Sequence, residues 1–226
     1  MNVRPHLQRL TCTLLILGFL AGCCEVPPVA PAAGDLTEAE IATLSTLEKV
    51  DDYPLYTMHY AGEYDLYRAD ADPADRAWAC SLFAALGNPD DMQYGRNFDW
   101  EYSPALLLFT DPPDGYASVS MVDIAYLIDQ DQVSSLTDLP LAEREPLLAA
   151  PFLPFDGMNA HGLVVGMAAV PGSEMANDED KETLDSLAII REMLDHARDV
   201  DEALAIIEQY NMDCGRGPAL HYLFPQ

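Results

Sequence analysis

The chain has 226 residues, half of them hydrophobic, which is enough for one domain with a substantial core. Its 38 acidic side chains outnumber 11 lysines and arginines, and the formal net charge is -27. Nucleic acid is therefore excluded as an expected partner, because binding to phosphates needs clustered basic side chains. Electrostatic docking on anionic lipid is not expected for the same reason.

The first 22 residues have the pattern of a secretory signal peptide. Two arginines precede the apolar run TCTLLILGFLAG, which is too short to span a bilayer comfortably. The run ends in LAGC, which resembles the lipobox of bacterial lipoproteins and implies that Cys23 carries lipid. The alternative is an ordinary secretory signal or a short anchor. We expect an exported protein of the bacterial cell envelope, anchored to the membrane by lipid on Cys23 and followed by a Pro-rich tether over 23–35.

Three cysteines remain beyond the signal and the lipobox, namely Cys24, Cys80 and Cys214. Two of them could form a disulfide in an exported protein, and the third would then stay free or pair elsewhere. No Cys and His spacing fits a zinc site. The acidic loop at 69–77 lacks the glycine and the terminal Glu of an EF-hand. We therefore expect no metal and no other cofactor.

The segment 36–79 precedes Cys80 and contains two predicted elements. LTEAEIATLSTLEKVDD, over 36–52, predicts a short amphipathic helix. YPLYTMHYAGEYDLYR, over 53–68, is rich in tyrosine and predicts one or two strands.

A hairpin is predicted next. CSLFAAL and MQYGRNFDW indicate two strands, and GNPDD between them is a strong turn signal. Pairing about this turn brings Cys80 close to Phe98 and Asp99. Side chains alternate along a strand, so Arg96 and Asp99 should point to opposite faces unless a bulge or the strand end intervenes.

The remaining pattern mixes strands and helices, which predicts an α+β fold. Two strands are expected around the DPPDG turn within 105–128, partly helical structure over 129–149, a turn feeding a buried strand over 155–172, helices over 183–197 and 199–210, and a final strand in ALHYLF. Asp199 and Glu202 give the second helix a capping-box-like start. Arg191, inside the first helix, is expected to form a surface ion pair.

Cys80 is a candidate nucleophile, because a thiol becomes reactive when a neighbouring group lowers its pKa or takes its proton. One route is a histidine base, from the set His59, His161, His196 and His221. The other route makes Cys80 the N-terminal residue. Its own α-amino group, with a pKa of about 7.7 to 8.0, would then act as the base. A nearby Arg would favour the thiolate, and an Asp would orient the ammonium group.

Arg96 and Asp99 follow Cys80 after 16 and 19 residues. In this spacing the sequence resembles the N-terminal nucleophile hydrolases of the choloylglycine hydrolase group, which includes penicillin V acylases, bile salt hydrolases, isopenicillin N acyltransferase and acid ceramidase-like amidases. DGMNAHGL, over 156–163, is similar to the family segment DGxNExGL, and ALHYL, over 219–223, is similar to its PLHxL strand. The resemblance runs from about residue 53 to residue 226.

The resemblance implies a four-layer αββα sandwich. It also implies autocatalytic cleavage of the chain between Ala79 and Cys80. Residues 36–79 would then be a pro-segment, which could stay attached without a covalent bond, and residues 80–226 the N-terminal part of the catalytic domain. Cys80 would attack a linear amide of a small N-acyl molecule, with Arg96 and Asp99 stabilising and orienting it. Asn159 is expected to shape the turn before the following strand.

Two departures from the family limit this expectation. Ala169 stands where bile salt hydrolases carry an oxyanion-hole Asn, and the loss of such a donor costs about 10²–10³ in rate. The family domain also continues past its LHxL strand, so we expect this chain to be a fragment or a C-terminally truncated copy. The alternatives are an acyltransferase that uses an amine acceptor, a non-catalytic or degenerate envelope lipoprotein, and a peptidase in which His161 or His221 serves Cys80.

Overall fold

The computed structural model describes residues 36–64, 80–88, 90–99, 104–170, 172, 177–215 and 217–225. The predicted signal peptide, the lipobox Cys23, the tether, Cys24 and Ala79 lie outside these residues. No helix among the described residues is long and apolar enough to cross a membrane.

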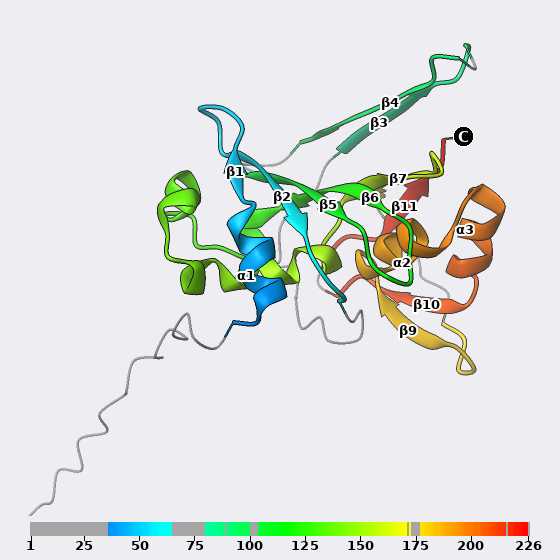
Figure 1. Ribbon diagram of the computed structural model, residues 1–226. Coiled ribbons are helices and arrows are strands. Elements are labelled where there is room, and N and C mark those ends of the chain that lie inside the picture. The colour runs from blue at the N-terminus through cyan, green and yellow to red at the C-terminus, as the bar shows by residue number, and fades with distance from the viewer. Residues whose placement is uncertain are drawn as a thin grey trace, which may run out of the picture.

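A seven-stranded sheet in the order β1-β2-β5-β6-β7-β8-β11 forms the centre of the fold (Figure 1). Its strands are β1 (Glu48–Lys49), β2 (Leu55–Tyr60), β5 (Ala105–Thr110), β6 (Ser118–Asp123), β7 (Asp156–Asn159), β8 (Val164–Ala169) and β11 (Leu220–Leu223). β2 and β5 pair in parallel, and the other neighbours are antiparallel. The strands predicted around DPPDG and in ALHYLF are confirmed, and β11 lies at the edge of the sheet.

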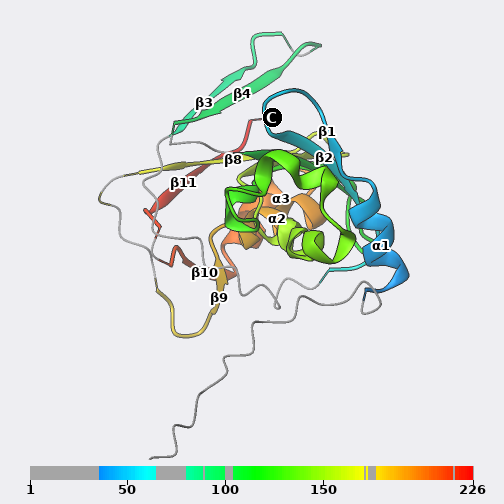
Figure 2. The ribbon, with the colours of Figure 1, turned by 90° about the vertical axis from the view of Figure 1, so that its left-hand side faces the viewer.

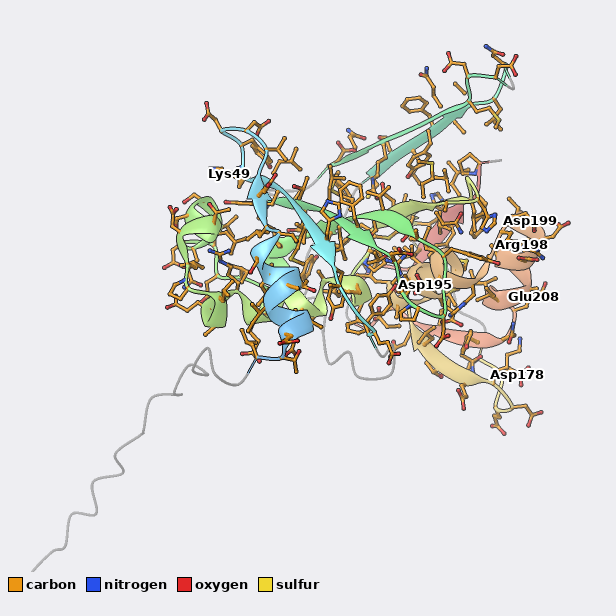
Figure 3. All side chains as sticks on the ribbon, viewed as in Figure 1. Lys49, Asp178, Asp195, Arg198, Asp199 and Glu208 are labelled. Atoms are coloured by element: carbon orange, nitrogen blue, oxygen red, sulfur yellow. The ribbon has the colours of Figure 1, made fainter. Side chains whose placement is uncertain are left out.

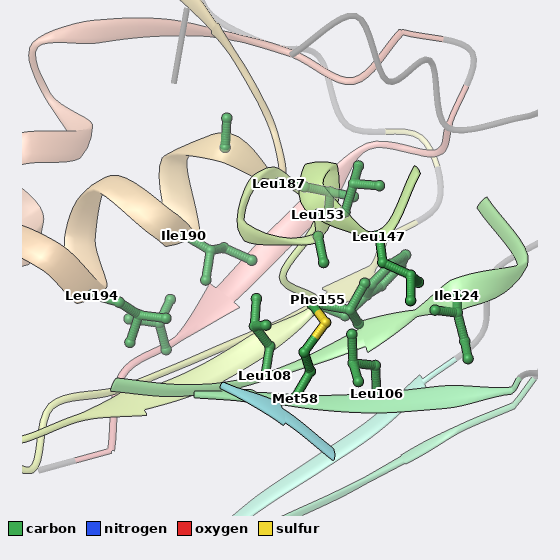
Figure 4. Packing of buried hydrophobic residues seen from close by; sticks show 14 of the residues in the cluster. Met58, Leu106, Leu108, Ile124, Leu147, Leu153, Phe155, Leu187, Ile190 and Leu194 are labelled. Carbon is green, nitrogen blue, oxygen red and sulfur yellow. The ribbon is translucent and has the colours of Figure 1, made fainter. Parts of the chain in front are cut away.

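Helices cover one face of this sheet and enclose the main core. They are α1 (Glu38–Ser45), α2 (Ala188–His196), α3 (Val200–Ile207) and the 3₁₀ helices η3 (Ile124–Tyr126), η4 (Val133–Asp138) and η5 (Leu141–Phe152). Alternation along β5 sends Leu106 and Leu108 into this core, where they are fully buried beside Met58 of β2. Figure 4 shows Leu108 on the side of Ile190 and Leu194 of α2, and Leu106 on the side of Ile124 and Leu147. The predicted α+β class is confirmed.

The opposite face of the sheet carries the hairpin of β3 (Cys80–Ala85) and β4 (Gln93–Phe98) (Figures 1 and 2). Its register places Cys80 opposite Phe98, which confirms the pairing predicted from the turn. The hairpin packs on β8 at Gly166. A Cβ there would lie 2.9 Å from Tyr94 Cζ and 3.1 Å from Leu82 Cδ2, so a larger residue would force these side chains to move.

Helix boundaries in three segments differ from the sequence prediction. The helix expected over 36–52 ends at Ser45, because the chain turns at Thr46 and pairs Glu48 and Lys49 with β2. The segment 183–197 begins as β9 (Glu182–Asp185) before α2, and the segment 199–210 ends as β10 (Tyr210–Asp213) after α3. β9 and β10 pair in parallel, a long-range contact that no local pattern specifies. The Asp199 side chain accepts from Glu202 N at 3.0 Å, as the predicted cap requires.

Two further segments refine the prediction. The partly helical structure expected over 129–149 consists of 3₁₀ helices, and η5 contains two prolines, which remove α-helical hydrogen bonds. The segment 155–172 starts as β7 and turns only after Asn159. Gly162 has a φ of 83° in this turn, and Gly157 packs so closely that a Cβ would lie 2.8 Å from Val119 O.

The expectation of a surface ion pair at Arg191 is wrong. Its side chain is fully buried between α2 and the sheet and lies 3.1 Å from the Asp195 carboxylate. Its guanidinium donates to the hydroxyls of Thr110 and Ser118, at the facing ends of β5 and β6. Tyr64 donates to the same carboxylate at 2.8 Å. Figure 3 shows Asp195 within the molecule and Asp178, Arg198, Asp199 and Glu208 at its outer edge. The helical pattern of the sequence does not reveal that Arg191 finds polar partners on β5 and β6, so its burial could not be predicted.

Candidate active site

Cys80 is the first residue of β3 and lies beside the far end of β8. β7 begins at Asp156, opposite Gly166, so β8 extends past it to Ala169. The backbone N–H of Ala169 lies near enough to the Cys80 sulfur to lower the pKa of its thiol. Arg96 Nη2 donates to Cys80 Sγ, at 3.2 Å. A thiol at the start of a strand therefore meets two donors, one from the hairpin and one from the sheet.

Arg96 is held on several sides, and its side chain is only 6% exposed. Nη1 donates to the carbonyl oxygen of Phe155 at 3.0 Å, and Nε lies 3.7 Å from Asp156 Oδ2. The guanidinium carbon stacks 3.5 Å above the centre of the Phe98 ring. These contacts fix the plane of the guanidinium group and turn Nη2 toward the sulfur.

Burial raises the pKa of three acidic groups in this cluster, Cys80, Tyr94 and Asp156. Burial raises the pKa of the Cys80 thiol, the Arg96 charge and the Ala169 N–H oppose this rise, and the Asp99 charge adds to it. Burial also raises the pKa of Asp156, against the lowering effect of Arg96. The pKa of Tyr94 is raised by burial and then by the Asp156 charge. In the uncut chain, Cys80 is therefore a thiol that still needs a base.

Asp99 lies on the other side of the hairpin from Arg96. It follows the last residue of β4, is exposed, and accepts from Asn97 Nδ2 at 2.7 Å and from Ser81 Oγ at 3.3 Å. The alternation expected from the sequence is thus observed. The structure brings Cys80 and Arg96 into contact, whereas Asp99 acts on Cys80 only through its charge.

Asn159 serves the fold rather than the thiol. Its amide donates to the carbonyls of Leu194 and Ala197, at 3.0 and 2.6 Å, and thereby holds the end of α2. Its side-chain oxygen accepts from the backbone N–H groups of His161 and Leu163. These contacts agree with the expected turn-shaping role.

The candidate histidines are engaged elsewhere or lie apart from the thiol. His59 stacks on Phe109 at 4.7 Å, and His161 packs edge-on against Tyr116 at 4.3 Å. Within the described part of the chain, no recorded contact joins Cys80 to a histidine, and no cluster of His, Cys, Asp and Glu could hold a metal ion. Cys80 and Cys214, the cysteines in that part, are both free.

A groove of about 890 Å³ lies between the inner face of the hairpin and the open face of the sheet. Its lining is mostly apolar, with Tyr94 and Asp156 among the polar residues. Tyr94 pairs with Ala84, four residues along β3 from Cys80, which is about 13 Å. Arg96 lies between these two positions along the hairpin, and so lies between the groove and the sulfur.

Sequence reasoning missed two partners of Arg96. Asp156 belongs to the DGMN segment, so its motif was noticed but its contact with Arg96 was not predicted. The Phe155 contact uses a backbone carbonyl and leaves no signal in residue identity.

Comparison with known proteins gives partial structural likenesses. No family model and no curated protein match the sequence. The chain is similar to penicillin V acylase from Agrobacterium tumefaciens, 20% identical with a TM-score of 0.30, over 47% of this chain and 26% of that chain. It is also similar to a variant of conjugated bile acid hydrolase from Clostridium perfringens, 14% identical with a TM-score of 0.31, over 69% of this chain and 38% of that chain. Both neighbours are N-terminal nucleophile hydrolases of the choloylglycine hydrolase group. The chain thus spans well under half the length of either.

Proposed function

We propose that this chain is the N-terminal part of a linear amide hydrolase whose nucleophile is Cys80. One observation carries the proposal: the sulfur at the start of β3 accepts a hydrogen bond from Arg96 Nη2 at 3.2 Å. Most lone buried cysteines pack as small apolar residues and have no charged donor of this kind.

The first step of the proposal releases the nucleophile. The Cys80 thiol attacks the carbonyl carbon of Ala79, the C–N bond to Cys80 breaks, and the acyl group moves to sulfur. Water then hydrolyses this thioester, which leaves a carboxylate on Ala79 and a free α-amino group on Cys80. That amino group has a pKa of about 7.7 to 8.0 and supplies the base that the uncut thiol lacks.

Turnover would use the same atoms on a small N-acyl amide. The amino group of Cys80 takes the thiol proton as the sulfur attacks the amide carbon, and it returns that proton to the leaving amine. Water hydrolyses the thioester and releases the acid. With an amine in place of water the same intermediate gives acyl transfer, which is the alternative reading of the site.

The Ala169 N–H offers a replacement for the missing Asn side chain. A backbone donor near the sulfur also lies close to an oxygen on the carbon bonded to that sulfur. Backbone N–H groups of this kind stabilise tetrahedral intermediates of acyl transfer. We therefore propose that Ala169 contributes its backbone, so that the side chain at this position need not donate.

We also propose that the hairpin begins the second sheet of a four-layer αββα sandwich, completed by residues beyond 226. A two-stranded ribbon is marginally stable alone. The hairpin and its turn expose Phe83, Leu86 and Met92, at 60%, 46% and 51%. Further strands that cover these side chains would complete the layer.

The intact mass of the full chain, measured beside Cys80→Ala and Cys214→Ser variants, tests the proposal. We expect a cut between Ala79 and Cys80 in the wild type and in the Cys214 variant, and no cut in the Cys80 variant. Hydrolysis of a series of N-acyl p-nitroanilides should follow the same pattern, and added hydroxylamine would reveal acyl transfer. An uncut wild type without thiol-dependent turnover would contradict the proposal.

A non-catalytic envelope lipoprotein is the second candidate. Two observations favour it. The Asp99 carboxylate accepts from Asn97 and makes no contact with Cys80. Burial also raises the pKa of the Cys80 thiol in the uncut chain, which favours its neutral form. For either candidate we propose export and lipid attachment at Cys23. A mature N-terminal peptide that carries acyl chains on Cys23, and that is lost in Cys23→Ala, would support this.

Residues 36–79 would remain bound after a cut at Ala79. β2 lies inside the sheet between β1 and β5, and its six residues pair with all six of β5. Leu44, Tyr56 and Met58 are fully buried. We propose that the lipid-bearing segment keeps the catalytic part at the membrane through this packing, so the two pieces should separate only under denaturing conditions.

A further inference from the structure

The guanidinium group of Arg96 is shared between two layers of the molecule. Arg96 belongs to β4 of the hairpin, whereas Asp156 is the first residue of β7 in the large sheet and Phe155 directly precedes it. The Phe155 carbonyl holds Nη1 at 3.0 Å, and the Asp156 carboxylate faces Nε at 3.7 Å. The remaining nitrogen, Nη2, meets the Cys80 sulfur. The hydrogen bond fixes Nη1, and the 3.7 Å approach of Nε to the Asp156 carboxylate is an electrostatic contact without a hydrogen bond; together they restrict where Nη2 can point.

We propose that Asp156 is a positioning residue that acts through Arg96, and that it keeps the Nη2 donor and the positive charge against the Cys80 sulfur. Its meaning for catalysis rests on the proposed amide hydrolase, but the contact itself belongs to the uncut chain. Asp156 contacts Arg96, and Arg96 contacts Cys80, so the influence of Asp156 on the sulfur passes through the guanidinium group.

Burial supports this role. Asp156 is 9% exposed, and a buried carboxylate is costly unless it serves a charged partner. The Phe98 ring on one face of the guanidinium limits its tilt, and Phe98 itself packs edge-on against the Phe155 ring at 5.8 Å. The hairpin and β7 therefore form one assembly around Arg96, with Asp156 as its carboxylate contact.

Two effects of Asp156 on the thiol have opposite signs, and this makes the proposal testable. If the carboxylate acted only through its negative charge, Asp156→Asn would lower the pKa of the Cys80 thiol. If it positions Arg96, the same change loosens the guanidinium and raises the thiol pKa. Asp99 provides the matched control, because it is a nearby carboxylate that does not contact Arg96 and whose charge raises the pKa of Cys80.

The experiment measures the rate of Cys80 alkylation by iodoacetamide against pH, by peptide mass, in the full chain. Intact mass first assigns each sample as cut or uncut, and variants are compared in the same form. We expect Asp156→Asn to slow alkylation at pH 7 by about threefold to tenfold, because an opposite charge within contact distance shifts a pKa by about 1–3 units and part of that is lost. Asp99→Asn should speed it.

The decisive comparison repeats Asp156→Asn in an Arg96→Met background, where no further slowing is expected. Equal slowing in both backgrounds, or faster alkylation in Asp156→Asn alone, overturns the proposal. Thermal unfolding verifies that each variant folds. If Asp156→Asn does not, Asp156→Ser carries the test with the same expected sign. Because no substrate is used, loss of the thiol effect is distinguished from failure of the hydrolase proposal, which intact mass and amide turnover report.

Discussion

The contact between the hairpin and the sheet at Gly166 can be tested by a single methyl group. In Gly166→Ala, the new Cβ would lie 2.9 Å from Tyr94 Cζ, closer still to the Tyr94 hydroxyl, and 3.1 Å from Leu82 Cδ2. Overpacking of this kind costs about 1–3 kcal/mol, and the lower entropy of the unfolded alanine chain offsets about 0.4–1 kcal/mol. We expect a net loss of about 1–2 kcal/mol in the free energy of unfolding.

Urea unfolding of the full chain measures this loss, with Gly87→Ala as the matched control. Gly87 lies in the hairpin turn segment, and no atom lies within 4 Å of a Cβ built there. The control change should therefore be neutral or slightly stabilising. Adding Tyr94→Phe removes the hydroxyl that the new methyl group would meet, so the two changes together should cost less than their sum, by about 1 kcal/mol. If Gly166→Ala unfolds at the same urea concentration as Gly87→Ala, the described packing is wrong.

Charged residues carry three further predictions. Arg191→Met should destabilise the protein by about 3–5 kcal/mol in urea unfolding, because it leaves a buried carboxylate without its charged partner. Arg198→Met changes an exposed ion pair, with the Arg198 side chain 58% open to solvent, and should leave the urea midpoint nearly unchanged. Folding raises the pKa of Asp156 above its ordinary value of 3.8. The folded state therefore binds the Asp156 proton more tightly, and this group stabilises the fold fully below pH 3.8 and less as pH rises through the folded pKa. Asp156→Asn should remove this part of the pH dependence. Asp199→Ala should cost about 1 kcal/mol through loss of the α3 cap, read from thermal unfolding beside Asp201→Ala. Equal losses within either matched pair, or an unchanged pH profile, would contradict the corresponding assignment.

The parts of the fold that local chemistry specifies were predicted from the sequence. The GNPDD turn fixes the register of the hairpin, and so places Cys80 opposite Phe98. DPPDG does the same for β5 and β6, which pair from Ala105–Asp123 to Thr110–Ser118. The alternation of side chains along a strand also predicted that Arg96 and Asp99 would lie on opposite faces of the hairpin.

Contacts that join distant segments were not predictable in this way. β9 and β10 are short strands next to strong helical patterns, and only their mutual pairing makes them strands. Arg191 has a helical neighbourhood typical of a surface, and its burial depends on hydroxyls from β5 and β6. The Phe155 carbonyl that holds Arg96 is a backbone atom and so has no residue signature.

The geometry of the candidate site therefore depends on the packing of the β3–β4 hairpin against the seven-stranded sheet. Cys80 and Arg96 come from the hairpin, whereas Ala169, Phe155 and Asp156 come from the sheet. We expect a methyl group at position 166 to push the hairpin away from the sheet, although it would meet Tyr94 and Leu82 and none of these five site residues. It should consequently slow Cys80 alkylation as well as reduce stability, because Arg96 cannot follow both layers. A Gly166→Ala protein that is destabilised but keeps wild-type thiol reactivity would mean that the site is held within the hairpin alone.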